Sequence, residues 1–150
     1  MVKDVLLSVQ GLQMSPEDGS DTVELITSGE YYYRNDKHYL LYEEVTEGFA
    51  KPTKNVIKAA PNYMELTKKG VVNVHMVFEK NQKTITYYYT PYGSLQIGID
   101  ATRVDVFETE DSILIDVEYG LEINCEFIAN CHIKIHAKPK GSHMQFDSNP

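Results

Sequence analysis

Apolar and polar residues alternate along most of this chain with a period of two. The pattern is clearest between Ile113 and Ala137, where every odd-numbered position is apolar and the positions between them are mostly acidic, amide or basic. Such alternation is typical of β-strands with one face in a core and the other in water. The segment is too long for one ordinary strand, so we predict a hairpin that turns at Asn124-Cys125-Glu126.

A second, central hairpin is predicted around Asn35-Asp36. Both residues tolerate left-handed backbone, and runs rich in tyrosine flank them. A two-residue turn at this point places Tyr33 opposite His38 on the partner strand. Because cross-strand neighbours share a face of the sheet, Tyr31, Tyr33 and His38 are expected on the inner face.

The rest of the chain repeats the theme of a short strand followed by a polar turn. Helical periodicity is nearly absent, with at most one short turn near Glu44–Phe49. Further strands are predicted over Val2–Met14, Thr22–Tyr33, Thr53–Ala60, Tyr63–Thr67, Val71–Glu79, Lys83–Thr90 and Leu95–Val106. The pattern indicates an all-β fold, an up-and-down antiparallel barrel of about eight to ten strands with little or no helix. A barrel of this size is either filled by side chains or holds one small ligand.

One predicted strand contains an irregularity. In Leu95–Val106 the apolar positions are odd up to Ala101 and even from Val104 onward. A slip of one residue within a strand is what a β-bulge produces, and bulges bend strands at the corners of barrels. We therefore expect this strand to bend near Ala101.

The length of 150 residues favours a single domain. We assign residues 1–138 to one barrel and residues 139–150 to a C-terminal tail, in which Gly141–Met144 resembles a sequence left by an expression vector.

The net charge of −8 argues against nucleic acid, which selects basic surfaces, and against anionic membrane surfaces. The first residues carry an apolar run too short for a signal-peptide core, and no stretch has the length of a membrane span. We therefore expect a cytoplasmic protein that binds neither nucleic acid nor membrane. Neither a monomer nor a homodimer is selected by the sequence.

Several short motifs resemble one bacterial family. They are Gly29-x-Tyr31, Lys37-x-Tyr39-Leu40-x-Tyr42-x-Glu44, Lys69-Gly70, Phe78 and Tyr89-Thr90-x-Tyr92-Gly93. Together they resemble the YwiB-like family of bacterial β-barrel proteins, and the likeness extends over roughly Lys3 to Lys138. The resemblance implies a calycin-like barrel, similar in architecture to lipocalins and fatty-acid-binding proteins. It implies no activity and no catalytic residues.

The candidate ligand-binding residues share the phase that we assign to the inner face. They are Tyr31, Tyr33, His38, Tyr42, Tyr87 and Tyr89. Apolar rings with a few hydroxyls and one imidazole are the usual make-up of a small-molecule pocket. The leading hypothesis is a non-enzymatic barrel that holds a small, partly apolar ligand. The alternative for these rings is that they simply fill the barrel.

Two other functions compete with ligand binding. A packed barrel would serve as a protein–protein interaction or homo-oligomerisation module if Tyr32, Tyr39, Leu41 and Tyr88 formed an exposed apolar patch. A hydrolase or isomerase would need His38 beside an acid, and on one strand His38 and Glu44 are roughly 20 Å apart.

Two acidic groups also lie in predicted turns. They are Glu43, Glu44 and Glu47, and Glu108, Glu110 and Asp111. Carboxylates in turns are usually solvated, so we assign no catalytic residue.

The histidines and cysteines do not predict a metal or a cofactor. His132 and His136 are roughly 13 Å apart on a strand and face away from Cys131, so zinc is not expected. His75 also falls on the outward phase of its strand. Cys125 and Cys131 are roughly 20 Å apart on an extended strand, too far for a disulfide.

Overall fold

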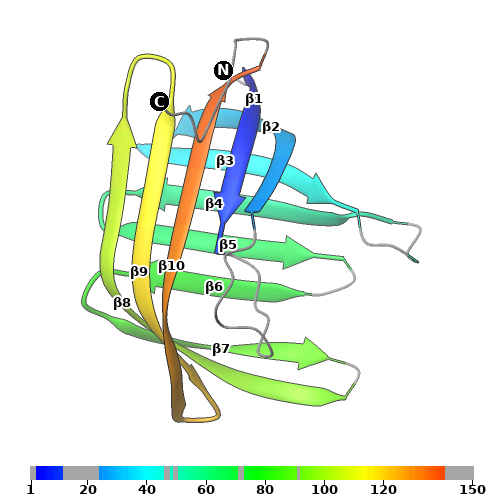
Figure 1. Ribbon diagram of the computed structural model, residues 1–150, viewed down its shortest axis with the longest axis vertical. Coiled ribbons are helices and arrows are strands. Elements are labelled where there is room, and N and C mark those ends of the chain that lie inside the picture. Colours follow the sequence, from blue (N-terminus) through cyan, green and yellow to red (C-terminus); the bar gives the residue numbers. More distant parts are fainter. Residues whose placement is uncertain are drawn as a thin grey trace.

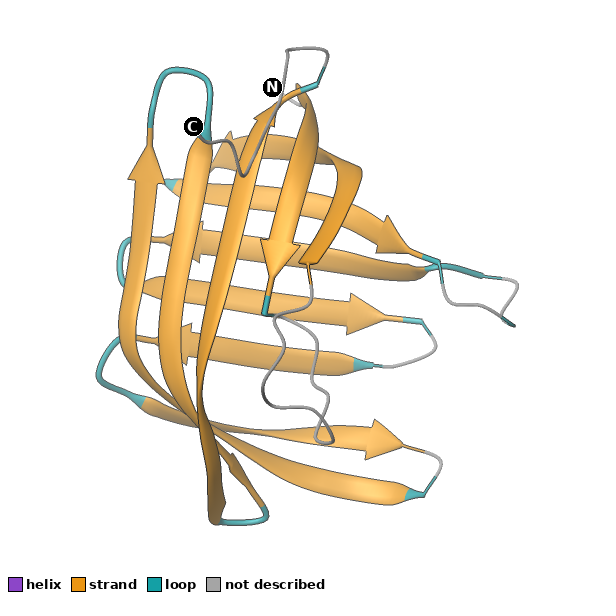
Figure 2. Cartoon of the chain, in the orientation of Figure 1, coloured by secondary structure: helices purple, strands orange, loops and turns teal. Residues whose placement is uncertain are grey.

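The computed structural model describes residues 3–11, 24–45, 48, 51–70, 73–90 and 92–140. Figure 2 shows only strands and loops in this part of the chain. The strands are β1 Lys3–Gln10, β2 Glu24–Arg34, β3 Lys37–Glu44, β4 Thr53–Ala60, β5 Tyr63–Lys69, β6 Val74–Glu79, β7 Lys83–Thr90, β8 Gly93–Glu108, β9 Ile113–Ile123 and β10 Glu126–Pro139. The prediction of an all-β chain is confirmed. The predicted helical turn near Glu44–Phe49 and the tail beyond residue 140 lie largely or wholly outside the described residues, as does the start of the predicted strand Val71–Glu79.

The ten strands form one antiparallel sheet in the order β6-β5-β4-β3-β2-β1-β10-β9-β8-β7. The first strand pairs with both its successor and the last strand and so lies in the middle of this order. The sheet curls into a nearly closed barrel, which brings its two end strands together (Figure 1). In Figure 1, β3–β6 run across β8–β10, which gives the barrel two crossing layers. Consecutive strands β6 and β7 form the two ends of this order, and the Thr84 hydroxyl donates to the Val77 carbonyl between them at 2.5 Å.

Two-residue turns connect the strands of both predicted hairpins. Asn35 and Asp36 have φ values of 54° and 62°, and the pairing of Tyr33 with His38 follows. Asn124 and Cys125 have φ values of 51° and 70° at the tip of the β9–β10 hairpin. Left-handed backbone at both positions matches the twist of the strands on either side. Both hairpins are therefore confirmed.

The predicted bulge is also present. The register between β8 and β9 shifts between Ala101 and Arg103, which leaves Thr102 as the extra residue. Ala101 and Val104 are both buried although they lie three positions apart. The bulge therefore keeps both parts of β8 facing the core, and β8 curves along its length in Figure 1.

The barrel interior is occupied mainly by aliphatic side chains from both layers. The largest fully buried side chains are Phe78, Leu7, Leu40, Ile57, Met64, Leu66, Met76, Ile97, Ile99, Ile115, Ile133 and Ile135. The ring of Phe78 packs edge-on against Tyr119, with centroids 5.0 Å apart. The tyrosines expected inside do not fill this centre. Instead they lie toward the ends of the barrel or outside it.

The predicted inner face of β7 is wrong. Tyr87 and Tyr89 are 50% and 65% exposed on the outer face, whereas Tyr88, expected to lie outside, packs against the core. The cause is the register with β8, which pairs Tyr88 with Leu95 and Thr86 with the buried Ile97. Cross-strand partners share a face, so the even-numbered positions of β7 point inward.

Candidate functional site

A tyrosine and a histidine contact each other at one end of the barrel. Tyr31 of β2 and His38 of β3 face inward on neighbouring strands, and the Tyr31 hydroxyl lies 2.8 Å from Nδ1 of His38. The imidazole is only 5% exposed and lies beside two rings, with centroids 5.9 Å from Tyr31 and 4.8 Å from Tyr33. The central hairpin therefore holds His38 in a fixed, nearly dry position.

The other ring nitrogen of His38 faces an acid from the opposite layer. Nε2 of His38 lies 3.8 Å from a carboxylate oxygen of Glu108, at the end of β8. Burial lowers the pKa of His38, and Glu108 only partly offsets this effect, so the imidazole is neutral at neutral pH. A carboxylate beside Nε2 favours the tautomer with the proton on Nε2. Nδ1 then accepts the hydrogen bond from Tyr31.

The phenol of Tyr31 keeps its proton. Burial, followed by the charge of Glu108, raises the pKa of Tyr31 above its ordinary value. The proton lies in the hydrogen bond to His38, so the lone pairs of the phenol oxygen remain available. Tyr31 therefore presents an acceptor.

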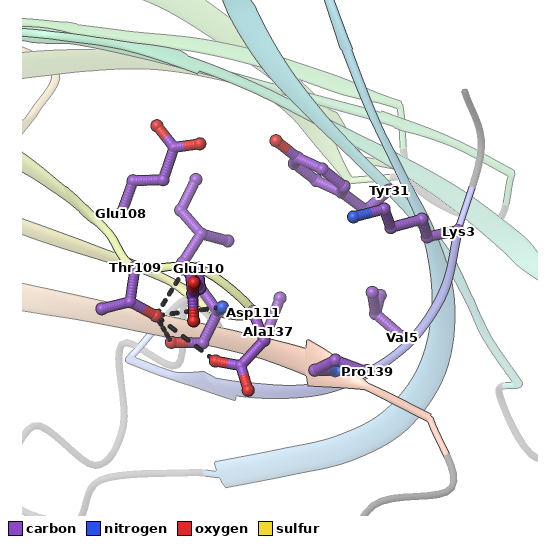
Figure 3. Close-up of a pocket in the computed structure, with 11 residues that line it drawn as sticks. Lys3, Val5, Tyr31, Glu108, Thr109, Glu110, Asp111, Ala137 and Pro139 are labelled. Atoms are coloured by element: carbon purple, nitrogen blue, oxygen red, sulfur yellow. Dashed lines mark hydrogen bonds between the residues drawn. The ribbon is translucent and has the colours of Figure 1, made fainter.

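A cavity of about 140 Å³ opens beside this group. It lies where β1, β2 and β10 meet the turn between β8 and β9, because β1 pairs with both β2 and β10. Figure 3 draws its lining residues, which are Lys3, Val5, Tyr31, Glu108, Thr109, Glu110, Asp111, Ser112, Ile113, Ala137 and Pro139. In this view the phenol oxygen of Tyr31 and the Glu108 carboxylate lie on the same side of the cavity.

The cavity wall is part apolar and part charged. Val5, Ile113 and Ala137 are buried strand residues that give it an apolar base. The polar part lies in the β8–β9 turn, where the backbone N–H of Thr109 donates to the carbonyl of Ser112 at 2.9 Å. The two hydroxyls of this turn also bond to each other at 2.8 Å. An apolar base with a few fixed polar groups is the usual composition of a small-molecule site.

The six predicted site residues are divided among three places. Tyr31, Tyr33 and His38 come together as expected, although Tyr33 lies at the end of its strand and is half exposed. Tyr42 is buried on the same inward phase, nearer the other end of β3. Tyr87, like Tyr89, lies on the outside of the barrel.

His38 and Glu44, the pair that a hydrolase or isomerase would need, are not brought together, as their separation along β3 predicts. One oxygen of Glu44 accepts hydrogen bonds from Lys68 at 2.7 Å and from Asn55 at 3.0 Å. Burial, together with the charge of Glu44, raises the pKa of Tyr42. Among the residues that the structure describes, no hydrogen-bond partner lies beside the amide oxygen of the buried Asn55. Glu44 thus belongs to a polar cluster at the far end of β3, and the acid beside His38 is Glu108.

The other histidines within the described ranges are His75, His132 and His136, which pair with acids or lie half-buried on their strands. His132 is exposed and bonds to Asp116 at 2.5 Å. His75 is also exposed, as predicted, and bonds to Glu65. His136 is half-buried, and burial lowers its pKa. The expectation of solvent-facing side chains therefore fits His132 better than His136.

The cysteines lie in different settings. Cys125 is exposed in the β9–β10 turn, Cys131 is half-buried in β10, and both thiols are free. Over the part of the chain that the structure describes, no three His, Cys, Asp or Glu side chains gather in a way that suits a metal ion. None of the described residues form a helix suited to crossing a bilayer.

The role of the acidic residues around the β8–β9 turn does not follow from the sequence pattern. Carboxylates in turns are usually solvated, yet Glu108, Glu110 and Asp111 line the cavity, together with Lys3. Their proximity to Tyr31 follows from the pairing of β1 with β10. The two-residue period shows which face a residue takes, but it does not show which ends of distant strands meet.

The comparisons with known proteins agree with the resemblance read from the sequence. The chain is 24% identical over 111 residues to the uncharacterised β-barrel protein YwiB of Bacillus subtilis strain 168, covering 73% of this chain and 77% of that protein. Its fold is similar to the crystal structure of the ywiB protein from Bacillus subtilis, with a TM-score of 0.74, 20% identity and 94% of each chain covered. The structural likeness confirms the β-barrel fold. A family model described as a domain of unknown function, DUF1934, matches residues 7–135, and the chain therefore belongs to this family.

Proposed function

We propose that this protein binds a small, partly apolar molecule in the cavity at the Tyr31 end of the barrel. The observation that carries the proposal is the cavity itself, about 140 Å³ in volume, with an apolar base and a wall that carries Tyr31 and Glu108. For scale, an apolar protein cavity of about 150 Å³ admits benzene. The ligand is therefore about the size of one substituted ring.

The proposed site lies at the mouth of the barrel, whereas the hypothesis from the sequence places the ligand inside it. Aliphatic side chains such as Leu7, Ile57 and Ile115 occupy the centre and are fully buried. Displacing them would cost the free energy of packing that holds the two layers together. At the mouth, a ligand meets side chains that are already held by the Tyr31–His38 hydrogen bond and by the β8–β9 turn. Pre-positioned groups lower the entropic cost of binding.

A pair of matched substitutions tests the proposal. Tyr31 lines the cavity and Tyr87 lies on the outer face, so Tyr31→Leu and Tyr87→Leu remove the same ring at two different places. We expect single-ring compounds in a ligand-observed NMR screen to bind the parent protein and the Tyr87→Leu variant. The Tyr31→Leu variant should lose this binding while its circular dichroism spectrum stays unchanged. Equal binding by both variants would refute the cavity as the site.

A second candidate function is association with another copy of this chain through the outer face of β7. Ile85, Tyr87 and Tyr89 form one row there and are 47%, 50% and 65% exposed. Large exposed apolar side chains in a group are typical of interaction surfaces. Sedimentation velocity tests this candidate, because a dimer that dissociates in the Tyr87→Ser variant would support it. A parent protein that stays monomeric at all concentrations would exclude it.

A further inference from the structure

The phenol of Tyr31 reaches the cavity with its own proton already committed. Its hydroxyl donates to Nδ1 of His38 at 2.8 Å, and the second ring nitrogen of His38 faces Glu108. If the imidazole turned its N–H toward Tyr31 instead, a lone pair on Nε2 would face the carboxylate, which is unfavourable. The Glu108–His38–Tyr31 arrangement therefore makes the phenol oxygen an acceptor toward the cavity.

The other polar groups of the wall are also mainly acceptors. Glu108, Glu110 and Asp111 bring three carboxylates, against one ammonium from Lys3. The hydroxyl of Thr109 is engaged with that of Ser112 across the turn. A molecule in this cavity thus meets lone pairs and negative charge on its polar side. It meets apolar carbon at the base.

Resting on the function proposed above, we propose that the cavity selects small molecules that carry a protonated amine on an apolar body. An ammonium group supplies three donors, which suit the Tyr31 oxygen and the neighbouring carboxylates. A carboxylate ligand would meet like charges and an acceptor with no proton to offer. A neutral alcohol would fill the same space, but its hydrogen bonds to Tyr31 and Glu108 would lack the assistance of a positive charge.

Three probes of similar size separate these classes. Benzylamine, benzyl alcohol and benzoate each carry one phenyl ring and differ mainly in the charge of the polar group. We expect isothermal titration calorimetry at neutral pH and low salt to give the tightest binding for benzylamine, by about tenfold over benzyl alcohol, with no binding of benzoate. Added salt should weaken only the binding of benzylamine, because screening acts on charges.

Conservative variants locate the effect in the wall. Tyr31→Phe keeps the ring and removes the acceptor, and Glu108→Gln keeps the shape and removes a charge. Each should weaken benzylamine binding about threefold to tenfold, since exposed charge pairs contribute modestly. The binding of benzyl alcohol should weaken less, because its hydrogen bonds to these groups lack the assistance of a positive charge. Lys3→Met removes the competing cation and should strengthen benzylamine binding. Glu30→Gln, a matched charge change at an exposed β2 residue outside the cavity lining, should have no effect.

The outcomes separate this inference from the proposed function. If benzyl alcohol or benzoate binds as tightly as benzylamine and Tyr31→Leu abolishes that binding, the cavity is a ligand site but its selection of amines is refuted. If benzylamine binds equally well to the parent, Tyr31→Phe and Glu108→Gln proteins, it binds elsewhere and the inference is refuted. If none of the three probes binds, both proposals are refuted.

Discussion

The side chain that most directly reports on packing inside the barrel is Phe78. Its ring is 0% exposed, extends inward from β6 and packs edge-on against Tyr119 of β9, with centroids 5.0 Å apart. Because β6 lies at one end of the strand order and β9 lies near the other, this contact joins parts of the sheet that share no backbone ladder. Replacing Phe78 by alanine therefore tests how the two crossing layers adhere.

The decrease in the free energy of unfolding caused by Phe78→Ala follows from the complete burial of the ring. Truncating a fully buried phenylalanine costs about 3–5 kcal/mol, which includes the cavity left behind. Of this, the edge-to-face contact with Tyr119 accounts for about 0.5–1.5 kcal/mol. A domain of this size has a free energy of unfolding of about 5–15 kcal/mol, so the variant should still fold at low temperature. With a urea slope of about 2 kcal/mol/M, the midpoint should fall by about 2 M.

Urea unfolding followed by circular dichroism measures this change. Phe107→Ala is the matched control, because Phe107 is 52% exposed at the end of β8. We expect it to cost less than about 1 kcal/mol, as surface substitutions do. If Phe78→Ala costs no more than Phe107→Ala, the Phe78 ring is not packed between the layers and the description of the core is wrong.

Three further predictions concern protonation, a turn and a close contact. Burial lowers the pKa of His38 below its ordinary value of 6.5, so the unfolded chain binds more protons and stability should fall as the pH drops through that value. Urea unfolding across a pH series measures this, in a His136→Gln background because the pKa of His136 is also lowered. The free energy of unfolding should fall less steeply with decreasing pH in His38→Asn than in its His38 parent. An unchanged pH dependence would contradict the burial of His38. Asp36→Gly should raise the melting temperature by about 2 °C in calorimetry, because φ of 62° suits glycine, whereas a loss would argue against the left-handed turn. Gly29→Ala should cost about 1–3 kcal/mol in urea unfolding, because a Cβ would lie 2.6 Å from the carbonyl oxygen of Leu41, and a neutral effect would contradict the close pairing of β2 with β3.

Much of the fold could be predicted because alternation and turn chemistry are local. The pair Asn35-Asp36 fixed the register of its hairpin, and the phase slip after Ala101 marked a bulge. Asn124-Cys125 marked the tip of the β9–β10 hairpin, whose register then shifts between Phe127 and Ala129. These signals rest on steric limits within a few residues. Such local signals do not depend on how the rest of the chain folds.

The prediction for the inner face of β7 was wrong because both phases of this strand carry aromatic or β-branched residues. In such a strand neither face is clearly more polar than the other, so the register with the partner strand determines which face points inward. The pairing was available in principle, since a short turn of even length places an even-numbered residue such as Tyr88 opposite an odd-numbered one such as Leu95. The acid beside His38 was missed for a different reason. Glu108 reaches His38 only when the sheet curls, and this closure joins residues far apart in the sequence.

A crystal structure of the protein grown with benzylamine tests the central claim most directly. The account predicts the ammonium group within hydrogen-bond distance of the phenol oxygen of Tyr31 and a carboxylate oxygen of Glu108, with the phenyl ring against Ile113. The hydrogen bond between Tyr31 and His38 should be retained. A structure with benzylamine elsewhere and this cavity unoccupied, or with the Tyr31 hydroxyl turned away from His38, would contradict the account.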